Sequence, residues 1–308
     1  MTAANAAAGV LQVAAVGIAP LLPGTIQTVK ARLQGRRGPS PLQPYRALRR
    51  LWGKSAVDPE GTTAVYRLAP PVVAACLLSA LAIVPVAGGA GGWGLGHDAL
   101  VLAGLLALAR FAIVAASWDS ASGFALMGAA RELMFAVFGE ALLVLALLLA
   151  ALPAQSTDLV AMADAAAGTA IWAAPAHWCA ALAFALVILV ETGRQPVDNP
   201  DTHLELTMIH EGPLLEYAGR DLAYLQWAAA ARHWVVLVLG AELFLPHGDG
   251  FAGRVGVLTL TLAALCLLLA AGETVQAKMR ILRVPSLIGL ACVVALAGAG
   301  SWIAGVGV

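Results

Sequence analysis

Apolar runs of about twenty residues recur along the whole chain, and this pattern limits the possible folds more than any other feature of the sequence. A helix of about 20 apolar residues crosses the hydrocarbon core of a bilayer. We expect eight such spans, at about 6–26, 66–88, 97–117, 134–152, 171–190, 228–245, 251–271 and 284–304. Charged residues make up 12% of the 308 positions, about half of the roughly 25% that soluble domains carry. The sequence therefore predicts an all-α, polytopic membrane helix bundle that forms a single integral membrane domain over residues 1–308.

The basic residues are distributed unevenly between the loops. Half of the eighteen lie in the loop after the first predicted span, at Lys30, Arg32, Arg36, Arg37, Arg46, Arg49, Arg50, Lys54 and Arg67. The loops near 88–97, 153–170 and 246–250 contain none. Because Lys and Arg collect in cytoplasmic loops, this asymmetry predicts that both termini lie outside. The formal net charge is zero, so nothing in the charge balance points to nucleic acid as a partner.

The basic loop contains a predicted amphipathic helix. Proline and glycine residues interrupt the chain between Gly35 and Pro44, as is typical of a break after a span. From Tyr45 to Trp52 the apolar residues fall on one helical face, and Arg46, Arg49 and Arg50 take the others. This pattern is typical of a helix on the cytoplasmic membrane surface. Such a helix can anchor the chain to anionic lipid or dock a protein partner, and the sequence leaves both readings open.

The most polar stretch of the chain runs from Glu191 to Asp221, between two predicted spans. It carries seven of the eighteen carboxylates, at Glu191, Asp198, Asp201, Glu205, Glu211, Glu216 and Asp221. Asn199 and Pro200 have the pattern of a helix start, so we expect a helix from there to about Gly212. Its mixed apolar and acidic character favours a segment folded back into a polar cavity over a solvated face. Its two histidines, seven residues apart, do not match HExxH spacing, and no metal site is predicted.

Among the charged residues inside or at the ends of predicted spans, we single out Arg110, Glu140, Glu242 and Glu273. A charge in the centre of a membrane helix costs at least roughly 2.5–3.5 kcal/mol, so such residues face a wet interior or pair with an opposite charge. One reading is a proton-exchanging chain from Glu140 through Glu242 to the acidic stretch. The other is fixed ion pairing, for instance of Arg131 or Arg110 with Glu140. The four cysteines lie in apolar runs without a CxxC pair, which argues against an iron–sulfur or zinc site.

Four segments carry a family pattern. These are KARLQGRRGPSPLQPYRALRRLWGK at Lys30–Lys54, GAARELMFAVFGE at Gly128–Glu140, ETGRQPVDNP at Glu191–Pro200 continued by HLELTMIHE at His203–Glu211, and ETVQAKMRILRVP at Glu273–Pro285. In this order they resemble the membrane subunit of formate hydrogenlyases and related energy-converting nickel–iron hydrogenases, the formate hydrogenlyase subunit 4 family. That family is similar in turn to membrane subunit 1 of respiratory complex I. The resemblance covers nearly the whole chain.

The resemblance implies a non-catalytic membrane subunit of an oxidoreductase complex in the cytoplasmic membrane of a bacterium or archaeon. It would hold no cofactor or metal, and its partners would be a nickel–iron large subunit, an iron–sulfur small subunit and an antiporter-like membrane subunit. It would anchor the redox arm and couple electron transfer to proton or ion movement. The implied proton-relay residues, with Glu242 added from its place in a span, are Glu140, Glu191, Asp198, Asp201, Glu205, Glu211, Glu216 and Glu242. Those that would dock the arm or line the mouth of the cavity are Arg32, Gln34, Arg36, Arg37, Arg131 and Arg194.

The chain departs from the complex I pattern in the acidic stretch. Complex I reads APFDLPEAESEL where this chain reads QPVDNPDTHLEL, with Val197, Asn199 and Asp201 at changed positions. These differences place the chain with the hydrogenases and argue against quinone binding. Two alternatives remain at this stage. One is a quinone-chamber subunit of a complex I-like NADH dehydrogenase. The other is a stand-alone secondary transporter, which broken helices and inverted repeats would favour, although the sequence shows no repeat.

Overall fold

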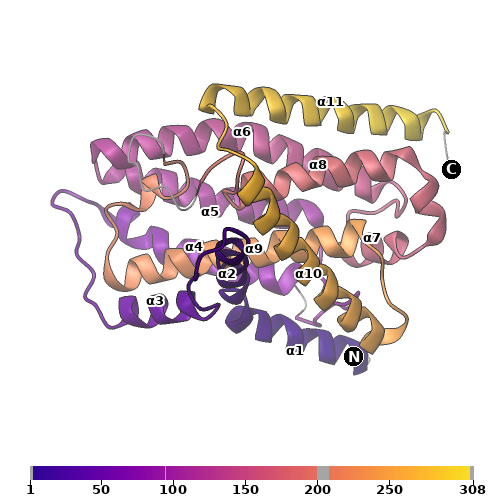
Figure 1. Cartoon of the computed structure of the whole chain (residues 1–308), viewed down its shortest axis with the longest axis horizontal. Helices are drawn as coiled ribbons and strands as arrows, with labels where there is room; N and C mark the ends of the chain where they lie inside the picture. Colours follow the sequence, from indigo (N-terminus) through magenta and orange to yellow (C-terminus); the bar gives the residue numbers. More distant parts are fainter. Residues whose placement is uncertain (1–2, 94, 200–207, 306–308) are drawn as a thin grey trace.

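The structure is a computed structural model that describes residues 3–93, 95–199 and 208–305 (Figure 1). Its regular structure is helical, with bounds α1 Ala3–Ile18, α2 Leu21–Leu33, α3 Gln43–Trp52, α4 Ala64–Ile83, α5 Ala99–Asp119, α6 Gly123–Ala151, α7 Leu159–Ala166, α8 Pro175–Glu191, α9 Gly219–Phe244, α10 Gly250–Val275 and α11 Val284–Ile303. Three short 3-10 helices, η1 Thr169–Ala173, η2 Gly212–Leu214 and η3 Ile281–Arg283, join them. The predicted all-α membrane bundle is confirmed.

Within the described residues, six helices are long and apolar enough to cross a membrane: α4, α5, α6, α9, α10 and α11 with the turn before it. The pair α1 and α2 makes a seventh if it counts as one span bent by 55°. The apolar α8 has 17 residues. The number eight stays a prediction.

Two helix starts were predicted too late. Helix α6 begins at Gly123 instead of about 134, and α9 begins at Gly219 instead of about 228. In both cases the helix continues through charged residues at which the apolar run stops, such as Glu132 in α6 and Asp221 in α9. Hydropathy alone ends a span where charge begins. Helix α6 extends past this point because Glu132 pairs with Arg110 inside the protein.

The predicted first span is broken between α1 and α2. The break leaves helical carbonyl groups without partners, and such groups must be satisfied inside a membrane. The Tyr45 hydroxyl of α3 donates to the carbonyl oxygens of Gly17 and Ile18, at 2.6 and 3.4 Å. The sequence-predicted amphipathic helix is therefore present as α3, and it braces the bend.

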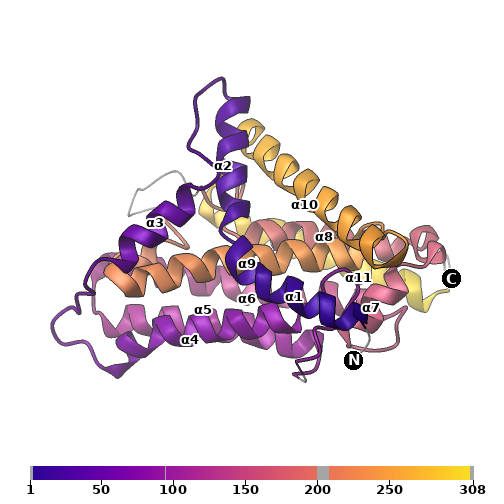
Figure 2. The ribbon, with the colours of Figure 1, turned by 90° about the horizontal axis from the view of Figure 1, so that it is seen from below.

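Helix α9 runs through the centre of the bundle, and α3 lies along its first turns (Figure 2). Residues Val235–Leu239 of α9 are 0% exposed. Small residues allow close helix contacts, as expected in membrane bundles: a Cβ at Gly139 would lie 2.8 Å from the Val190 side chain. A Cβ at Gly298 would lie 2.6 Å from Cys179. Helix α2 projects away from the bundle and meets the end of α10 (Figure 2).

Candidate functional site

A buried arginine, Arg110 on α5, is the centre of the charged site. Its side chain contacts three carboxylates: Nε lies 2.9 Å from Glu132, Nη1 3.0 Å from Glu140 and Nη2 2.7 Å from Glu191. Glu132 and Glu140 lie on α6, and Glu191 is the last residue of α8. Arg110 is 4% exposed. The planar guanidinium presents donors in several directions at once, and it therefore ties three helices together.

A second arginine, Arg232 on α9, completes this cluster. Its Nη1 lies 2.6 Å from Glu191, and its Nη2 donates to the Leu106 carbonyl oxygen at 3.0 Å. A cavity of about 110 Å³ borders both arginines together with Glu132, Glu191 and His210. Cavities of this size with several polar partners can hold water. The cluster therefore joins its helices beside a space large enough for water.

The acidic stretch folds back against this cluster through Asp198. The buried Asp198 carboxylate accepts backbone N–H bonds from Asn199 at 2.8 Å and from Ile209 at 3.3 Å. Lys278 lies 2.7 Å away, in the segment between α10 and α11. Asp198 is therefore inside the protein, as the cavity reading predicted. The described end of the predicted helix, Met208–Glu211, is not helical, because its backbone turns to bind Asp198. Asp201, Glu205 and the rest of that helix lie outside the described residues.

His210 stands between the Arg110 cluster and Asp198. Its Nε2 lies 3.7 Å from Glu132 Oε2, and its Nδ1 lies 3.6 Å from Asp198 Oδ2. Among the described residues, neither Glu132 Oε2 nor His210 Nδ1 has a hydrogen-bond partner. Burial lowers the pKa of the His210 imidazole, but the Glu132 and Asp198 carboxylates raise that pKa further, so it ends above 6.5. A protonated His210 would therefore present one N–H group to each of two carboxylates.

The same contacts affect Asp198. Burial raises the pKa of its carboxyl group, but His210 and Lys278 lower that pKa by more, and the result is well below the ordinary 3.8. Asp198 therefore stays ionised near neutral pH. Histidine is the side chain that changes charge in that range, which singles out His210 as the titrating member of this part of the site.

We expect the thermal stability of the protein to fall as the pH rises through the raised pKa of His210. A group with a higher pKa in the folded state stabilises the fold below its unfolded pKa, and that contribution disappears as the pH passes the folded pKa. Thermal unfolding in mild detergent, from about pH 5 to above pH 8, measures the effect. His210→Gln should lack this part of the pH dependence, and His97→Gln should retain it. Equal pH profiles for wild type and His210→Gln would contradict the expectation.

Gly193 places the imidazole. Its φ is +60°, and a Cβ there would lie 2.8 Å from His210 Nδ1. We expect Gly193→Ala to destabilise the fold by about 1–2 kcal/mol through the left-handed backbone and also to displace His210. Gly61 has a φ of +85° and nothing within 4 Å of its added Cβ, so Gly61→Ala tests backbone strain alone. The pH dependence of thermal unfolding should change in Gly193→Ala only; a matching change in Gly61→Ala would contradict this role.

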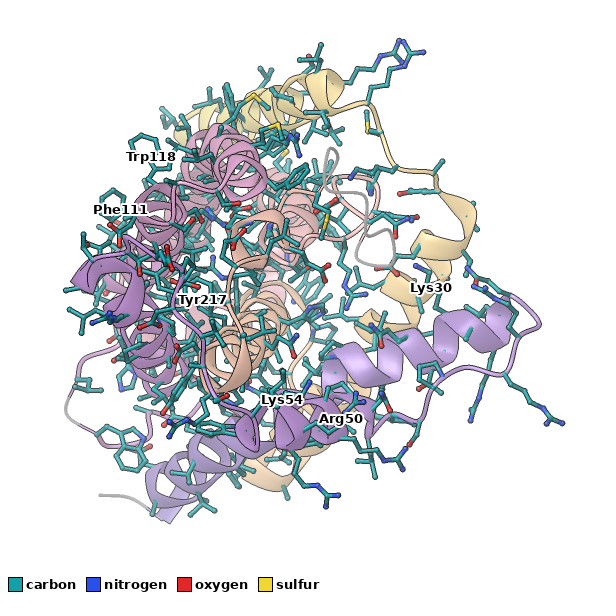
Figure 3. The ribbon with its side chains drawn as sticks, turned by 90° about the vertical axis from the view of Figure 1, so that its left-hand side faces the viewer. Lys30, Arg50, Lys54, Phe111, Trp118 and Tyr217 are labelled. Atoms are coloured by element: carbon teal, nitrogen blue, oxygen red, sulfur yellow. The ribbon has the colours of Figure 1, made fainter. Side chains whose placement is uncertain are left out.

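A second group of ion pairs joins α2, α10 and the segment after α8. Glu273 of α10 accepts from Lys30 Nζ and from Arg194 Nη1, both at 2.9 Å. All three residues are buried, and Figure 3 shows Lys30 on α2 beside α10. Arg194 was predicted to dock a soluble arm or to line the mouth of a cavity. It is buried and lines a partly open cavity, so its place agrees better with the mouth of a cavity than with a docking surface.

The other residues predicted for docking or proton relay are exposed or half-buried. Arg32, Gln34, Arg36 and Arg37 are exposed at the far end of α2. Arg131 is half-buried and donates to the Met208 carbonyl oxygen at 2.9 Å. Glu211 and Glu216 are half-buried at the end of the acidic stretch.

Two tyrosines hold that end of the stretch against α4. The rings of Tyr66 and Tyr217 stack with centroids 4.3 Å apart. The Tyr66 hydroxyl donates to the Glu216 carbonyl oxygen at 2.8 Å, and the Tyr217 hydroxyl donates to the Tyr66 carbonyl oxygen at 2.9 Å. Tyr217 is buried among the helices (Figure 3). The segment that leads from the site into α9 therefore has a fixed course.

Glu242 does not join the chain of acids that was expected to run from Glu140 to the acidic stretch. Glu242 lies ten positions after Arg232 on α9, and ten positions correspond to about 15 Å along a helix. Its carboxylate accepts from the backbone N–H groups of Ala87 and Gly88, at 2.8 and 3.2 Å. The sequence indicates the depth of a residue in a span but not the face of the bundle it meets, so it did not show that Glu242 contacts the turn after α4. A relay role of Glu242 stays a prediction.

Sequence reasoning missed several members of the site: Lys30, Glu132, His210, Arg232 and Lys278 had no relay role. Arg232 carried a usable signal, because it lies within the predicted span 228–245 and charges in spans are functional candidates. Glu132 carried the same signal once α6 was extended to Gly123. His210 and Lys278 lie in loops, where the sequence offers no comparable signal.

These observations define a class of protein: a polytopic helical membrane protein with a buried chain of ion pairs. The profile of the family described as "NADH dehydrogenase" matches residues 6–304. Formate hydrogenlyase subunit 4 of Escherichia coli is 33% identical over 260 residues, 84% of each chain. Hydrogenase-4 component C of the same organism is 34% identical over 232 residues, 75% of this chain and 72% of that one. The chain belongs to the NADH dehydrogenase family, as the motif resemblance indicated.

A solved structure has the same fold. The "Structure of the membrane-bound sulfane sulfur reductase (MBS), an archaeal respiratory membrane complex" contains a chain that superposes with a TM-score of 0.82 at 21% identity. The match covers 94% of this chain and 96% of that chain. The order and packing of the helices are therefore shared with that chain.

Proposed function

We propose that this chain is the membrane subunit of a formate hydrogenlyase-type hydrogenase complex, without catalytic residues of its own. It anchors a redox arm that contains a nickel–iron large subunit and an iron–sulfur small subunit, and it contacts an antiporter-like membrane subunit. It couples electron transfer in that arm to the movement of protons. The resemblance to formate hydrogenlyase subunit 4 over most of both chains supports the class, and the buried charge network supports the coupling role.

The observation that carries the proposal is the position of His210, whose ring nitrogens lie 3.7 Å from Glu132 and 3.6 Å from Asp198. A proton on His210 therefore changes the charge of a buried group of ion pairs. Because the dielectric constant inside a protein is low, such a change in charge also alters the interaction energies of the neighbouring ion pairs. Protonation of His210 is the step by which this chain senses or transmits a charge.

The route of proton exchange is lateral. Along α9, the fully buried apolar residues Val235–Leu239 separate the Arg232 end from Glu242, and dry hydrocarbon does not carry protons. The Glu140 side chain is 34% exposed and borders a groove with Cys292 between α6 and α11. On its buried side Glu140 pairs with Arg110, and the exposed part of its carboxylate faces this groove. The neighbouring membrane subunit binds at the groove and receives the proton from Glu140.

The arm binds at the end of α2. Exposed residues lie in the last turn of α2 and in the turn that follows it, where the helix projects from the bundle (Figure 2): Arg32, Gln34, Arg36 and Arg37. Because Lys and Arg collect in cytoplasmic loops, this end of α2 faces the cytoplasm, and both termini lie on the opposite side. A basic surface of this kind attracts a partner with an acidic patch.

A second candidate function is a quinone-reducing, complex I-like subunit. A cavity of about 310 Å³ lies between the start of α2, α3, α9 and the segment after α8. It borders Gln43, Arg194 and His233, which could orient a small polar headgroup. A broken helix, such as the bent pair α1 and α2, would favour a stand-alone transporter. Here Tyr45 of α3 braces the bend. Family membership favours a subunit of a complex instead.

Co-purification tests the proposal. The tagged chain is extracted in mild detergent, its partners are identified by mass spectrometry, and hydrogen evolution is assayed with and without a soluble quinone. We expect nickel–iron and iron–sulfur subunits, hydrogen activity and no response to quinone. A quinone-dependent activity would establish the second candidate. A chain that purifies alone without hydrogen activity would contradict both.

A further inference from the structure

A second polar cluster lies at the other end of α9, around Glu242. This carboxylate is 2% exposed. Two consecutive N–H groups, from Ala87 and Gly88, donate to it. Both residues have positive φ, +55° and +68°, so the 84–89 turn presents its amides as a concave anion site. Glu242 thereby joins the turn that follows α4 to the last turns of α9.

His247, in the connection from α9 to α10, faces the same carboxylate. Its side chain is 8% exposed, and its Nε2 lies 3.5 Å from Glu242 Oε2. Neither ring nitrogen has a hydrogen-bond partner among the described residues. A buried polar group without a hydrogen bond is destabilising. The imidazole is therefore placed to gain a partner, and the carboxylate beside it still has acceptor capacity.

Other charged groups also lie at this end. Arg254 of α10 packs against Gly88 of the turn and pairs with Asp164 of α7 at 3.2 Å. Asp98 accepts from Leu100 N–H and from the Thr157 hydroxyl, both at 2.7 Å. Asp249 is exposed, and on α8 the His177 ring packs against Phe244. Glu242 is thus the carboxylate in ion-pair distance of His247 among the described residues.

We propose that His247 and Glu242 form a proton-binding site that closes the α9–α10 connection onto the 84–89 turn. A proton from the water at this face binds to the imidazole. The resulting Nε2–H then donates to Glu242 Oε2, and a hydrogen bond between two charged groups is stronger than a neutral one. The site is separate from the His210 network, because the apolar Val235–Leu239 segment lies between them.

Hydrogen–deuterium exchange of residues 84–89 in the purified complex tests the proposal. Wild type and His247→Gln are compared at about pH 5.5 and about pH 8, the range in which histidine changes charge. Comparison at equal pH cancels the chemical exchange rate. At the lower pH we expect the wild-type amides of Ala87 and Gly88 to exchange about tenfold more slowly than those of the variant, which corresponds to about 1.4 kcal/mol. At the higher pH the two rates should approach each other.

Two further variants separate the pair from its surroundings. Glu242→Gln keeps a neutral acceptor for the turn but removes the anion, and it should abolish the difference between the two pH values. It also tests the site if His247→Gln does not fold. Asp249→Asn removes an exposed acid two residues from His247 and should behave as wild type. The proposal would be overturned if the ratio of exchange rates between His247→Gln and wild type were the same at both pH values. It would also be overturned if Asp249→Asn lost the slow exchange to the same extent as His247→Gln.

Discussion

Replacing Arg110 with methionine is expected to unfold or strongly destabilise the protein. The variant would leave Glu132 and Glu140 buried or half-buried without the cation that pairs with them, while Glu191 would keep Arg232. Removing one partner of a buried ion pair costs about 3–5 kcal/mol. For a chain of this size that is a fall of on the order of 10 °C in the unfolding temperature. Thermal unfolding in detergent, followed by size-exclusion chromatography, measures it.

Matched variants show whether the loss comes from unpaired charge. Arg67 pairs with Asp58 on the surface, with a side chain 64% exposed, so Arg67→Met should change stability by less than about 1 kcal/mol. Glu132→Gln added to Arg110→Met removes one unpaired carboxylate and should recover part of the loss. The stability of Arg110→Lys should lie between those of wild type and Arg110→Met, because an ammonium group keeps the charge but lacks the planar set of donors of a guanidinium. Equal stability of Arg110→Met and Arg67→Met would refute the central position of Arg110.

Replacing His210 with glutamine is expected to leave the complex assembled but to impair coupling. Glutamine fills similar space and offers a hydrogen bond, but it carries no exchangeable charge near neutral pH. Positioned proton-transfer groups contribute about 10²–10⁴-fold to rates, so we expect coupled hydrogen evolution to fall by at least tenfold. The measurement is hydrogen evolution by the purified complex together with subunit composition by mass spectrometry.

The control for this variant is His97→Gln. His97 Nδ1 contacts the Ile83 carbonyl oxygen at 2.7 Å, away from the network, and its loss should leave hydrogen evolution unchanged. If His210→Gln assembles fully and turns over at the wild-type rate, His210 transmits no charge. If both histidine variants lose activity equally, the effect belongs to folding and not to the network.

The helical bundle could be predicted from the sequence because its cause is local. Apolar runs of span length specify membrane helices wherever they occur, and the spacing of Tyr45 and Trp52 specified α3. Fixed pairing of Arg110 with Glu140 was one of the two readings considered, and the structure contains that pair at 3.0 Å. The burial of Asp198 followed from the mixed polarity of its segment.

The rest of the site depends on contacts between distant segments. Lys30 and Glu273 meet across 243 positions of the chain, and Arg110 meets Glu191 across 81. Sequence pattern does not specify which helix faces meet, so it did not place Glu242 beside the turn after α4 or Arg194 beside Glu273. The role of His210 follows from its distances to two carboxylates, which no motif contains.

Proton movement by the reconstituted complex tests the coupling role most directly. The purified complex is placed in liposomes with an internal pH dye, and hydrogen evolution is started with wild type or Glu140→Gln, which keeps the shape of the side chain at the lateral groove. We expect wild type to change the internal pH in a protonophore-sensitive way, and Glu140→Gln to evolve hydrogen with little or no such change. Equal pH changes per hydrogen evolved in both complexes would contradict a lateral proton route through this chain.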